Sequence, residues 1–262
     1  MRILVTGANG FLGSHIPGIP LLSNIENPIS LKEEIKSKSD GHEYVVVHCA
    51  ALTDVAECEA NPKQAFEVNV RGTRNVLEAI DPERGKFILL SSCHVFSGKK
   101  YFPYSEKHSP DPINVYGITK YGAEAYMSTY PNSLVLRVGK VYDESWIDKI
   151  MLMQEAVPSF IVRNFIYMDD FVGIMHIVID KMLTGYQFPR FNALYDVLHI
   201  GNPHQNFSYN LFYNLVRDEY ERVPLPKRST ELEDMAPRPH RCALNVGQMQ
   251  KMLGKGFTFR SL

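Results

Sequence analysis

The stretch MRILVTGANGFLG, residues 1–13, decides the fold of this chain. Residues 1–5 are apolar except for one arginine, which is typical of a buried parallel strand. The turn that follows holds three glycines, which tolerate a tight backbone and let a ligand come close. Where such a loop joins a strand to a helix start, backbone N–H groups face a dinucleotide pyrophosphate. The alternative is a purely structural glycine turn. The expected cofactor contacts are Gly7, Asn9, Gly10, Phe11, Leu12 and Gly13.

Further along the chain, short β-branched or leucine-rich segments alternate with segments of helical periodicity. Strands are expected at residues 44–48, 86–91 and 132–138, and helices at 61–80 and 113–130. This alternation predicts an α/β protein with a doubly wound parallel sheet, the Rossmann fold. We expect a dinucleotide-binding domain over residues 1–137. Residues 138–262 are expected to form mainly a small C-terminal substrate-binding lobe, with some segments returning to the Rossmann domain.

The region after the glycine loop departs from the usual Rossmann pattern. Pro17 and Pro20 come within seven residues of Gly13, so the first helix and the second strand should both be truncated. An acidic residue that binds the adenosine ribose is expected about 20 residues beyond the loop. Glu26 either fills that role or is a surface residue, and both interpretations stay open. The sequence therefore predicts NAD or NADP without choosing between them.

Composition narrows the class of protein. The 262 residues are enough for one large α/β domain with a sizeable core. A net charge of -1 without a long run of like charges predicts no nucleic-acid partner and no anionic membrane partner. No apolar run reaches the roughly 20 residues that span a bilayer, and we expect a cytoplasmic enzyme. No metal site is expected, because the cysteines form no CxxC pair and should be reduced thiols: Cys49, Cys58, Cys93 and Cys242.

A tyrosine and a lysine are spaced for proton transfer. Tyr116 and Lys120 are four residues apart and so lie on one face of the predicted helix. The lysine charge should lower the tyrosine pKa, which is normally near 10, towards the working range. Ser92 closes the predicted strand at its carboxyl end, where open α/β sheets bind ligands, so its hydroxyl can reach a substrate oxygen.

These residues, with several longer motifs, resemble the extended short-chain dehydrogenase/reductases that act on nucleotide sugars. The matches cover nearly the whole chain and include TGANGFLG, NPKQAFEVNVRGTRNVLEA, SSCHVFSG, PINVYGITKYGAE and RNFIYMDD. The resemblance implies that Ser92, Tyr116 and Lys120 are the catalytic set and that Lys120 also binds the cofactor ribose. It places Ala50, Ala51, Leu52 and Asn69 on the cofactor side. It also implies a homodimer formed through the helix that carries Tyr116 and the helix before it.

Two branches of this family compete for the function. VFSG, PYSE and PINVYGITK resemble the dTDP-4-dehydrorhamnose reductases, which implies NAD(P)H-dependent reduction of a 4-keto-6-deoxy nucleotide sugar. RNFIYMDD resembles the epimerases and dehydratases, which implies as the alternative a nucleotide-sugar C4 epimerase with tightly bound NAD. A third interpretation is a regulatory homologue that binds NAD(P) without turnover.

Four further residues are candidates near the substrate or its lobe. Cys93 and His94 follow Ser92 at the place where family members carry acid/base residues. His94 either donates and accepts a proton or only lines the pocket, whereas Cys93 should point into the core. Arg238 falls where such enzymes carry an Arg-Pro near the nucleotide diphosphate, which a guanidinium suits. Asp169 is expected either to cap a helix over residues 171–183 or to contact ligand.

Overall fold

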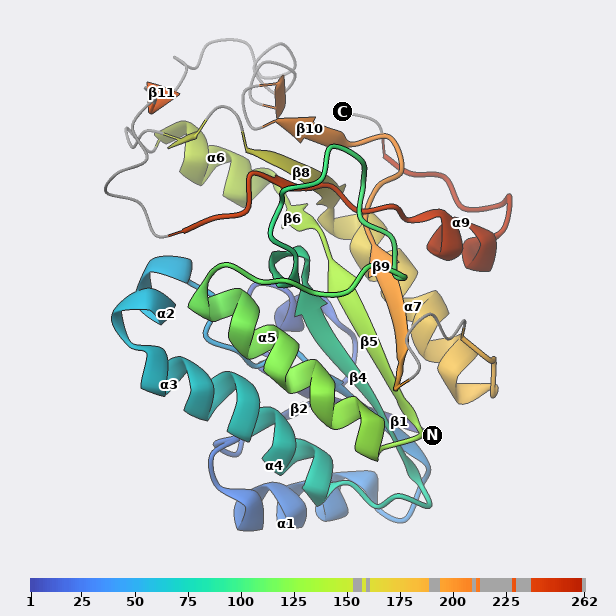
Figure 1. Ribbon diagram of the computed structural model, residues 1–262. Coiled ribbons are helices and arrows are strands. Elements are labelled where there is room, and N and C mark those ends of the chain that lie inside the picture. The colour runs from blue at the N-terminus through green and yellow to red at the C-terminus, as the bar shows by residue number, and fades with distance from the viewer. Residues whose placement is uncertain are drawn as a thin grey trace.

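The computed structural model describes residues 1–152, 157–158, 161–188, 194–208, 211–212, 228–229 and 237–260. Its main sheet has six parallel strands in the order β2-β1-β3-β4-β5-β9 (Figure 1). The strands are β1 Arg2–Thr6, β2 Ile19–Leu21, β3 Tyr44–His48, β4 Gly85–Ser92, β5 Ser133–Val138 and β9 Asp196–Ile200. The predicted α/β fold with a doubly wound parallel sheet is confirmed.

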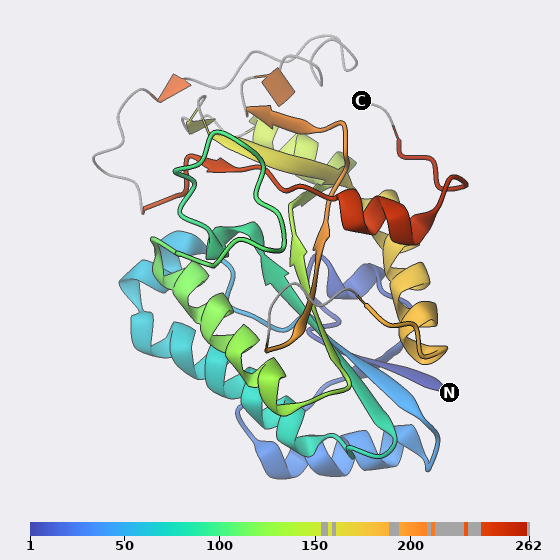
Figure 2. The ribbon, with the colours of Figure 1, turned by 45° about the vertical axis from the view of Figure 1, so that its right-hand side comes forward.

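Helices cover both faces of the main sheet, as Figures 1 and 2 show. Alternate residues of β3 point to opposite faces, as the pleat of a strand requires. Tyr44 and Val46 pack with α1, α4 and α5, whereas Val45 and Val47 pack with α7. Because both faces are buried, the strand reads as a continuous apolar run. The helices are α1 Pro28–Ser39, α2 Val55–Ala60, α3 Pro62–Phe66, α4 Gly72–Ala79, α5 Val115–Ala125, α6 Glu144–Leu152, α7 Met168–Leu183 and α9 Gly247–Leu253.

The first crossover is shortened, as the two prolines predict. One 3-10 turn, Gly13–His15, replaces the usual helix, and the chain passes directly into β2. A Cβ atom at Gly18 would lie 2.7 Å from Cγ2 of Val5, so this return segment lies directly against β1. The usual Rossmann sheet has two strands outside the first. Here β2 alone forms that edge.

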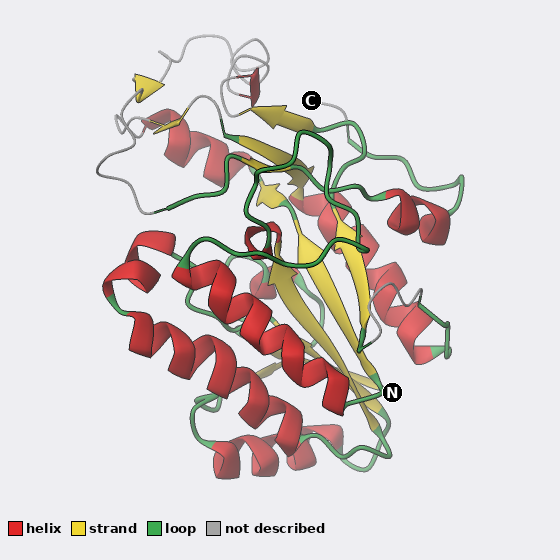
Figure 3. Ribbon diagram, viewed as in Figure 1, coloured by secondary structure: helices red, strands yellow, loops and turns green. Residues whose placement is uncertain are grey.

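A small second sheet lies beyond the carboxyl ends of the main strands (Figures 1 and 3). Its central strand is β8, Val162–Tyr167, which pairs with β6, Lys140–Tyr142, β10, Asn206–Ser208, and β12, Arg241–Cys242. The short strands β7, Val157–Pro158, and β11, Arg228–Ser229, pair with each other. Between the two sheets the chain crosses more than once, because α7 and β9 both return to the main sheet.

Two predicted helices differ from the observed ones. The helix expected over residues 61–80 is interrupted by one π-helical turn, Glu67–Arg71, between α3 and α4. The helix expected over 113–130 begins at Val115 and ends in a 3-10 turn, Tyr126–Thr129. Asp169 is not a cap, because α7 begins one residue earlier and Asp169 lies inside its first turn.

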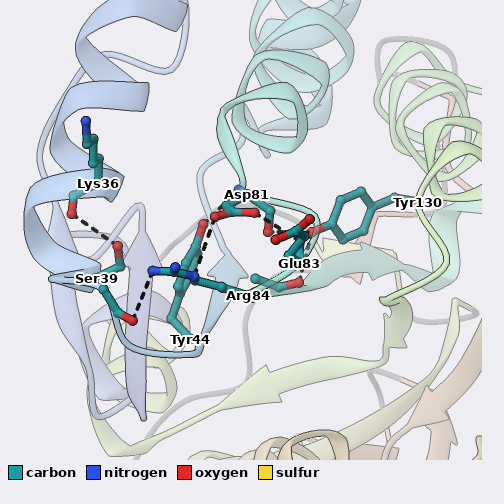
Figure 4. A network of polar contacts seen from close by, with 9 residues as sticks. Lys36, Ser39, Tyr44, Asp81, Glu83, Arg84 and Tyr130 are labelled. Atoms are coloured by element: carbon teal, nitrogen blue, oxygen red, sulfur yellow. Dashed lines mark hydrogen bonds and ion pairs between the residues drawn. The ribbon is translucent and has the colours of Figure 1, made fainter.

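The amino-terminal end of the sheet carries a polar network that is structural (Figure 4). Asp81 donates its backbone N–H to the Tyr44 hydroxyl at 2.9 Å, and the Tyr130 hydroxyl donates to the carbonyl of Gly85 at 2.9 Å. Tyr44 and Gly85 begin β3 and β4, so this network lies at the end of the strands opposite Ser92.

In the described ranges, no helix is both long and apolar enough to cross a membrane.

Candidate active site

The glycine loop is packed tightly against the chain that follows β3. Gly7 has a φ of +64°, and a Cβ atom there would lie 2.6 Å from the backbone nitrogen of Ala50. A Cβ atom at Gly13 would lie 2.2 Å from the carbonyl oxygen of Gly7. Side chains are therefore excluded at both positions. The tip of the loop, residues 9–11, is exposed at the carboxyl end of β1, where backbone groups can meet a ligand.

Asn69 anchors the predicted cofactor-binding segment, residues 50–52, through two hydrogen bonds to Leu52. Its Oδ1 accepts from the backbone N–H of Leu52 at 2.7 Å, and its Nδ2 donates to the Leu52 carbonyl and the Thr119 hydroxyl, both at 2.9 Å. Asn69 is fully buried and lies in the π-helical turn, a feature frequent at functional sites. Its side chain therefore positions the segment that contains Ala50, Ala51 and Leu52, and links it to α5.

His48 extends this buried network to β1, and the sequence did not single it out. Its Nδ1 lies 2.7 Å from the Thr6 hydroxyl and its Nε2 lies 3.0 Å from the Thr73 hydroxyl. Thr73 in turn donates to the carbonyl of Asn69 at 2.6 Å. Burial, together with the Lys120 charge, lowers the pKa of His48 to about 3. The imidazole is therefore neutral, so one ring nitrogen donates to one threonine hydroxyl and the other accepts from the second.

Ser92, Tyr116 and Lys120 come together at the carboxyl end of β4. Ser92 is the last residue of β4, and Tyr116 and Lys120 lie on one face of α5. Gly117 lets α5 approach this strand end, because a Cβ atom there would lie 2.2 Å from the carbonyl oxygen of His94. A hydrogen bond with Ser92 acts on the Tyr116 phenol. Ser92 and Tyr116 therefore meet at the carboxyl end of β4, and Lys120 lies one turn further along α5.

The predicted lowering of the Tyr116 pKa by Lys120 is not seen, because the pKa of Tyr116 is raised instead. Burial raises the pKa of Tyr116 above its ordinary value, and the hydrogen bond with Ser92 only partly opposes that shift. Burial also lowers the pKa of Lys120, to about 8, against the opposing charge of Glu124. Removing water destabilises phenolate and ammonium alike. In this pocket the phenol is therefore a proton donor at neutral pH.

A buried carboxylate lies one turn beyond Lys120 on α5. Glu124 accepts from the Ser91 hydroxyl at 2.6 Å, from Nη2 of Arg137 at 2.7 Å and from the Tyr195 hydroxyl at 2.9 Å. Arg137 and Glu124 are both almost fully buried. The Glu124 carboxylate thus lies where its charge acts on the Lys120 ammonium, and the sequence did not identify its ion pair with Arg137.

His94 lies beside Tyr116 among several cations. The two rings meet edge to face with centroids 5.5 Å apart. Burial, followed by the charges of Arg163, Arg238 and Lys140, holds the pKa of His94 well below its ordinary value. The Nε atom of Arg238 is buried and has no hydrogen-bond partner in the described part of the chain. Arg163 is buried and donates to the carbonyls of Val162 and Pro239, so among the described residues Arg238 is the cation here with an unused donor for an anionic ligand.

The sequence offers Cys93 as a candidate near the substrate and also predicts that it points into the core. The structure confirms the second expectation. The Cys93 side chain is buried in the main core cluster, and Cys242 donates its thiol to the Cys93 carbonyl at 3.2 Å. Cys93 begins the 3-10 turn Cys93–Val95 and its side chain packs into this core, so it is not a substrate contact. A cavity of about 290 Å³, lined by Gln250, Leu253 and Phe257 among others, lies against α9 and away from all candidate residues.

Four residues of the candidate site were not predicted from the sequence: Arg163, Asn114, Glu124 and His48. Arg163 stands in the quoted motif RNFIYMDD, and Asn114 in PINVYGITK. Both motifs were noted for the family resemblance and not for the chemistry of these side chains. An arginine inside an apolar strand is a signal that could have been used, since a buried charge requires a partner.

A doubly wound parallel sheet, a glycine loop after its first strand, and a Ser-Tyr-Lys group at the carboxyl end of β4 define a short-chain dehydrogenase/reductase. The family model described as the RmlD substrate binding domain matches residues 1–261. This chain belongs to that family, which confirms the resemblance seen in the sequence.

Known proteins in two branches are similar to this chain. It is 25% identical to the dTDP-4-dehydrorhamnose reductase of Aggregatibacter actinomycetemcomitans, over 97% of this chain and 93% of that protein. It is 30% identical to a putative UDP-glucose 4-epimerase of Methanocaldococcus jannaschii, over 64% of this chain and 70% of that protein. The crystal structure of a dTDP-4-dehydrorhamnose reductase from Bacillus anthracis in complex with NADP has a TM-score of 0.81 at 23% identity, covering 98% of this chain and 94% of that one.

Proposed function

We propose that this protein reduces the 4-keto group of a 6-deoxy nucleotide sugar with NADH or NADPH. The observation that carries the proposal is the position of Tyr116 beside Ser92 at the carboxyl end of β4, with Lys120 one turn further along α5. A phenol that keeps its proton at neutral pH is suited to protonate an alkoxide, which is the direction of a reduction. The named reductase relatives support the same chemistry.

The residues present fit a dinucleotide. The Gly7–Gly13 loop has no space for side chains at its two ends and leaves its tip exposed, so a pyrophosphate can approach the backbone. In this proposal the nicotinamide ribose binds to Lys120 and to the Ala50–Leu52 segment, which Asn69 holds through two hydrogen bonds to Leu52. When bound, a reduced nicotinamide would supply the hydride that adds to C4 of the sugar.

The side chains have distinct roles in this proposal. Tyr116 gives its phenolic proton to the carbonyl oxygen as the C–H bond forms, so the ketone becomes an alcohol. Ser92 donates a hydrogen bond to the same oxygen. Lys120, with a pKa of about 8, is mainly protonated at neutral pH and would stabilise the phenolate that remains. Arg238, whose buried Nε has no partner in the described part of the chain, would bind the diphosphate.

The direct test is to incubate the protein with NADH or NADPH and a panel of nucleotide-linked 4-keto-6-deoxy sugars. We expect cofactor absorbance to fall in proportion to the alcohol formed. A C4 epimerase, the alternative that the relative from Methanocaldococcus jannaschii supports, would instead retain NAD through purification and show no net redox change. A regulatory homologue would bind the cofactor and turn over nothing.

We also propose a homodimer that forms through α5 and α3. Large apolar side chains are exposed on these neighbouring helices: Ile118 and Tyr121 on α5 and Phe66 on α3. Exposed apolar side chains that gather on adjacent helices are typical of a subunit interface.

The four cysteines are free thiols, which supports action in a reducing compartment such as the cytoplasm.

A further inference from the structure

One side-chain amide joins three parts of the candidate site. Oδ1 of Asn114 accepts from the backbone N–H of Gly117 at 2.7 Å and so caps α5. Nδ2 of Asn114 lies 3.2 Å from Nδ1 of His94 and donates to the Pro237 carbonyl at 2.9 Å. Asn114 is only 2% exposed. It therefore connects the helix of Tyr116, the turn after Ser92 and the segment that leads to Arg238.

These contacts decide which nitrogen of His94 carries the proton. The backbone N–H of Gly117 needs an acceptor, so the oxygen of the Asn114 amide must face Gly117 and its nitrogen must face His94. An amide NH2 group only donates, so Nδ1 of His94 must be the nitrogen with the free lone pair. In a neutral imidazole the proton is then on Nε2.

The surroundings of His94 keep the ring neutral. Arg163 from β8, Lys140 from β6 and Arg238 from the segment before β12 all oppose a positive charge there, and Tyr116 packs edge to face. No acidic side chain in the described part of the chain contacts the ring. Its Nε2–H has no hydrogen-bond partner among the described residues, so it can serve a ligand.

We propose that Asn114 is a positioning residue that fixes His94 as the Nε2–H tautomer, and that His94 donates a hydrogen bond to a sugar oxygen beside Tyr116. His94 is then neither an acid nor a base, which decides between the two roles that the sequence left open. The tautomer follows from geometry alone, whereas the donation to a sugar oxygen rests on the proposed function.

The tautomer can be read in the ligand-free protein by long-range proton–nitrogen NMR of His94. We expect an unprotonated Nδ1 and a protonated Nε2 in the wild type. In Asn114→Asp, the carboxylate still caps α5 but accepts at His94, so the proton should move to Nδ1. Asn114→Ser keeps a cap and removes the amide, and should give a mixture of tautomers. A wild-type spectrum with Nδ1 protonated, or the same tautomer in all three proteins, overturns the inference.

The role of His94 is tested by kinetics of keto-sugar reduction. His94→Gln keeps a neutral N–H donor of similar reach, and should retain kcat/KM within a few-fold across neutral pH. His94→Leu should lose about tenfold, the usual effect of one hydrogen bond. Equal losses in both variants, or a wild-type pH profile that disappears in His94→Gln, would identify an acid/base role and overturn the inference. If no keto sugar is reduced at all, the proposed function fails and the NMR result still decides the tautomer.

Discussion

Glu124 and Arg137 form a buried ion pair directly beyond Lys120, with Oε2 and Nη2 2.7 Å apart. The carboxylate also accepts from Nε of Arg137 at 3.0 Å, so the contact is bidentate. Because Lys120 lies one helical turn away, the same carboxylate opposes the effect of burial on the lysine. The charge state of Lys120 thus depends on a carboxylate that is itself fully buried.

Glu124→Gln should destabilise the protein by about 3–5 kcal/mol, because it leaves the Arg137 charge buried without a counter-charge. It should also lower the pKa of Lys120 further below about 8, since the attraction to the carboxylate is lost. Urea unfolding measures the first effect and the pH profile of turnover the second. Glu78→Gln, which breaks the exposed pair with Arg74, is the control and should change stability by about 0.5 kcal/mol or less.

Tyr116→Phe should lower kcat by about 10²–10⁴-fold, because it removes the proton donor and leaves the ring in place. Cofactor affinity, measured by fluorescence titration with NADH and NADPH, should persist. Tyr121→Phe changes an exposed residue of the same helix and should have no effect. Unchanged turnover in Tyr116→Phe would contradict the mechanism.

Local patterns were enough to predict the main sheet except for its edge strand β9, and the positions of the glycine loop and of Ser92, Tyr116 and Lys120 at the carboxyl ends of strands or on α5. Each depends on residues close in sequence or on the rule that parallel strands end at one edge. The hydrogen bond by which Asn69 links the cofactor-side segment to α5 could not be predicted from local patterns, because its partner Thr119 is 50 residues away. The direction of the Tyr116 pKa was predicted wrongly for a different reason. Charge spacing is visible in a sequence, but the degree of burial is not.

Gly13→Ala should weaken cofactor binding at least about tenfold and destabilise the fold by about 1–3 kcal/mol. Its Cβ would lie 2.2 Å from the Gly7 carbonyl oxygen, so the loop must open to accept it. Titration with NADPH and thermal unfolding measure the two effects. Gly256→Ala adds the same methyl group where no atom lies within 4 Å, and should bind cofactor normally. Wild-type affinity in Gly13→Ala would exclude this loop as the dinucleotide site.

Ile118→Glu should convert the proposed homodimer to a monomer, because it puts a charge among the exposed apolar residues of α5 and α3. Sedimentation velocity at micromolar concentration measures the mass. Ile29→Glu is the matched control, since Ile29 is a more exposed isoleucine on another helix, α1. A change of mass in both variants, or in neither, would remove the support for this interface.

His48 should make the protein sensitive to acid. Its pKa is about 3 in the folded protein and near 6.5 in an unfolded chain, so between these values the unfolded chain binds a proton that the folded one does not. Stability should therefore fall as the pH falls from about 6.5 towards 3, by at most about 1.4 kcal/mol per pH unit from this group. Urea unfolding at several pH values gives the slope. His48→Gln should be less stable at pH 7, because the buried contacts to Thr6 and Thr73 are disturbed, but its slope should be shallower by about one proton. His42→Gln, at an exposed histidine, should keep the wild-type slope; equal slopes in all three proteins would show that His48 is not the group that titrates.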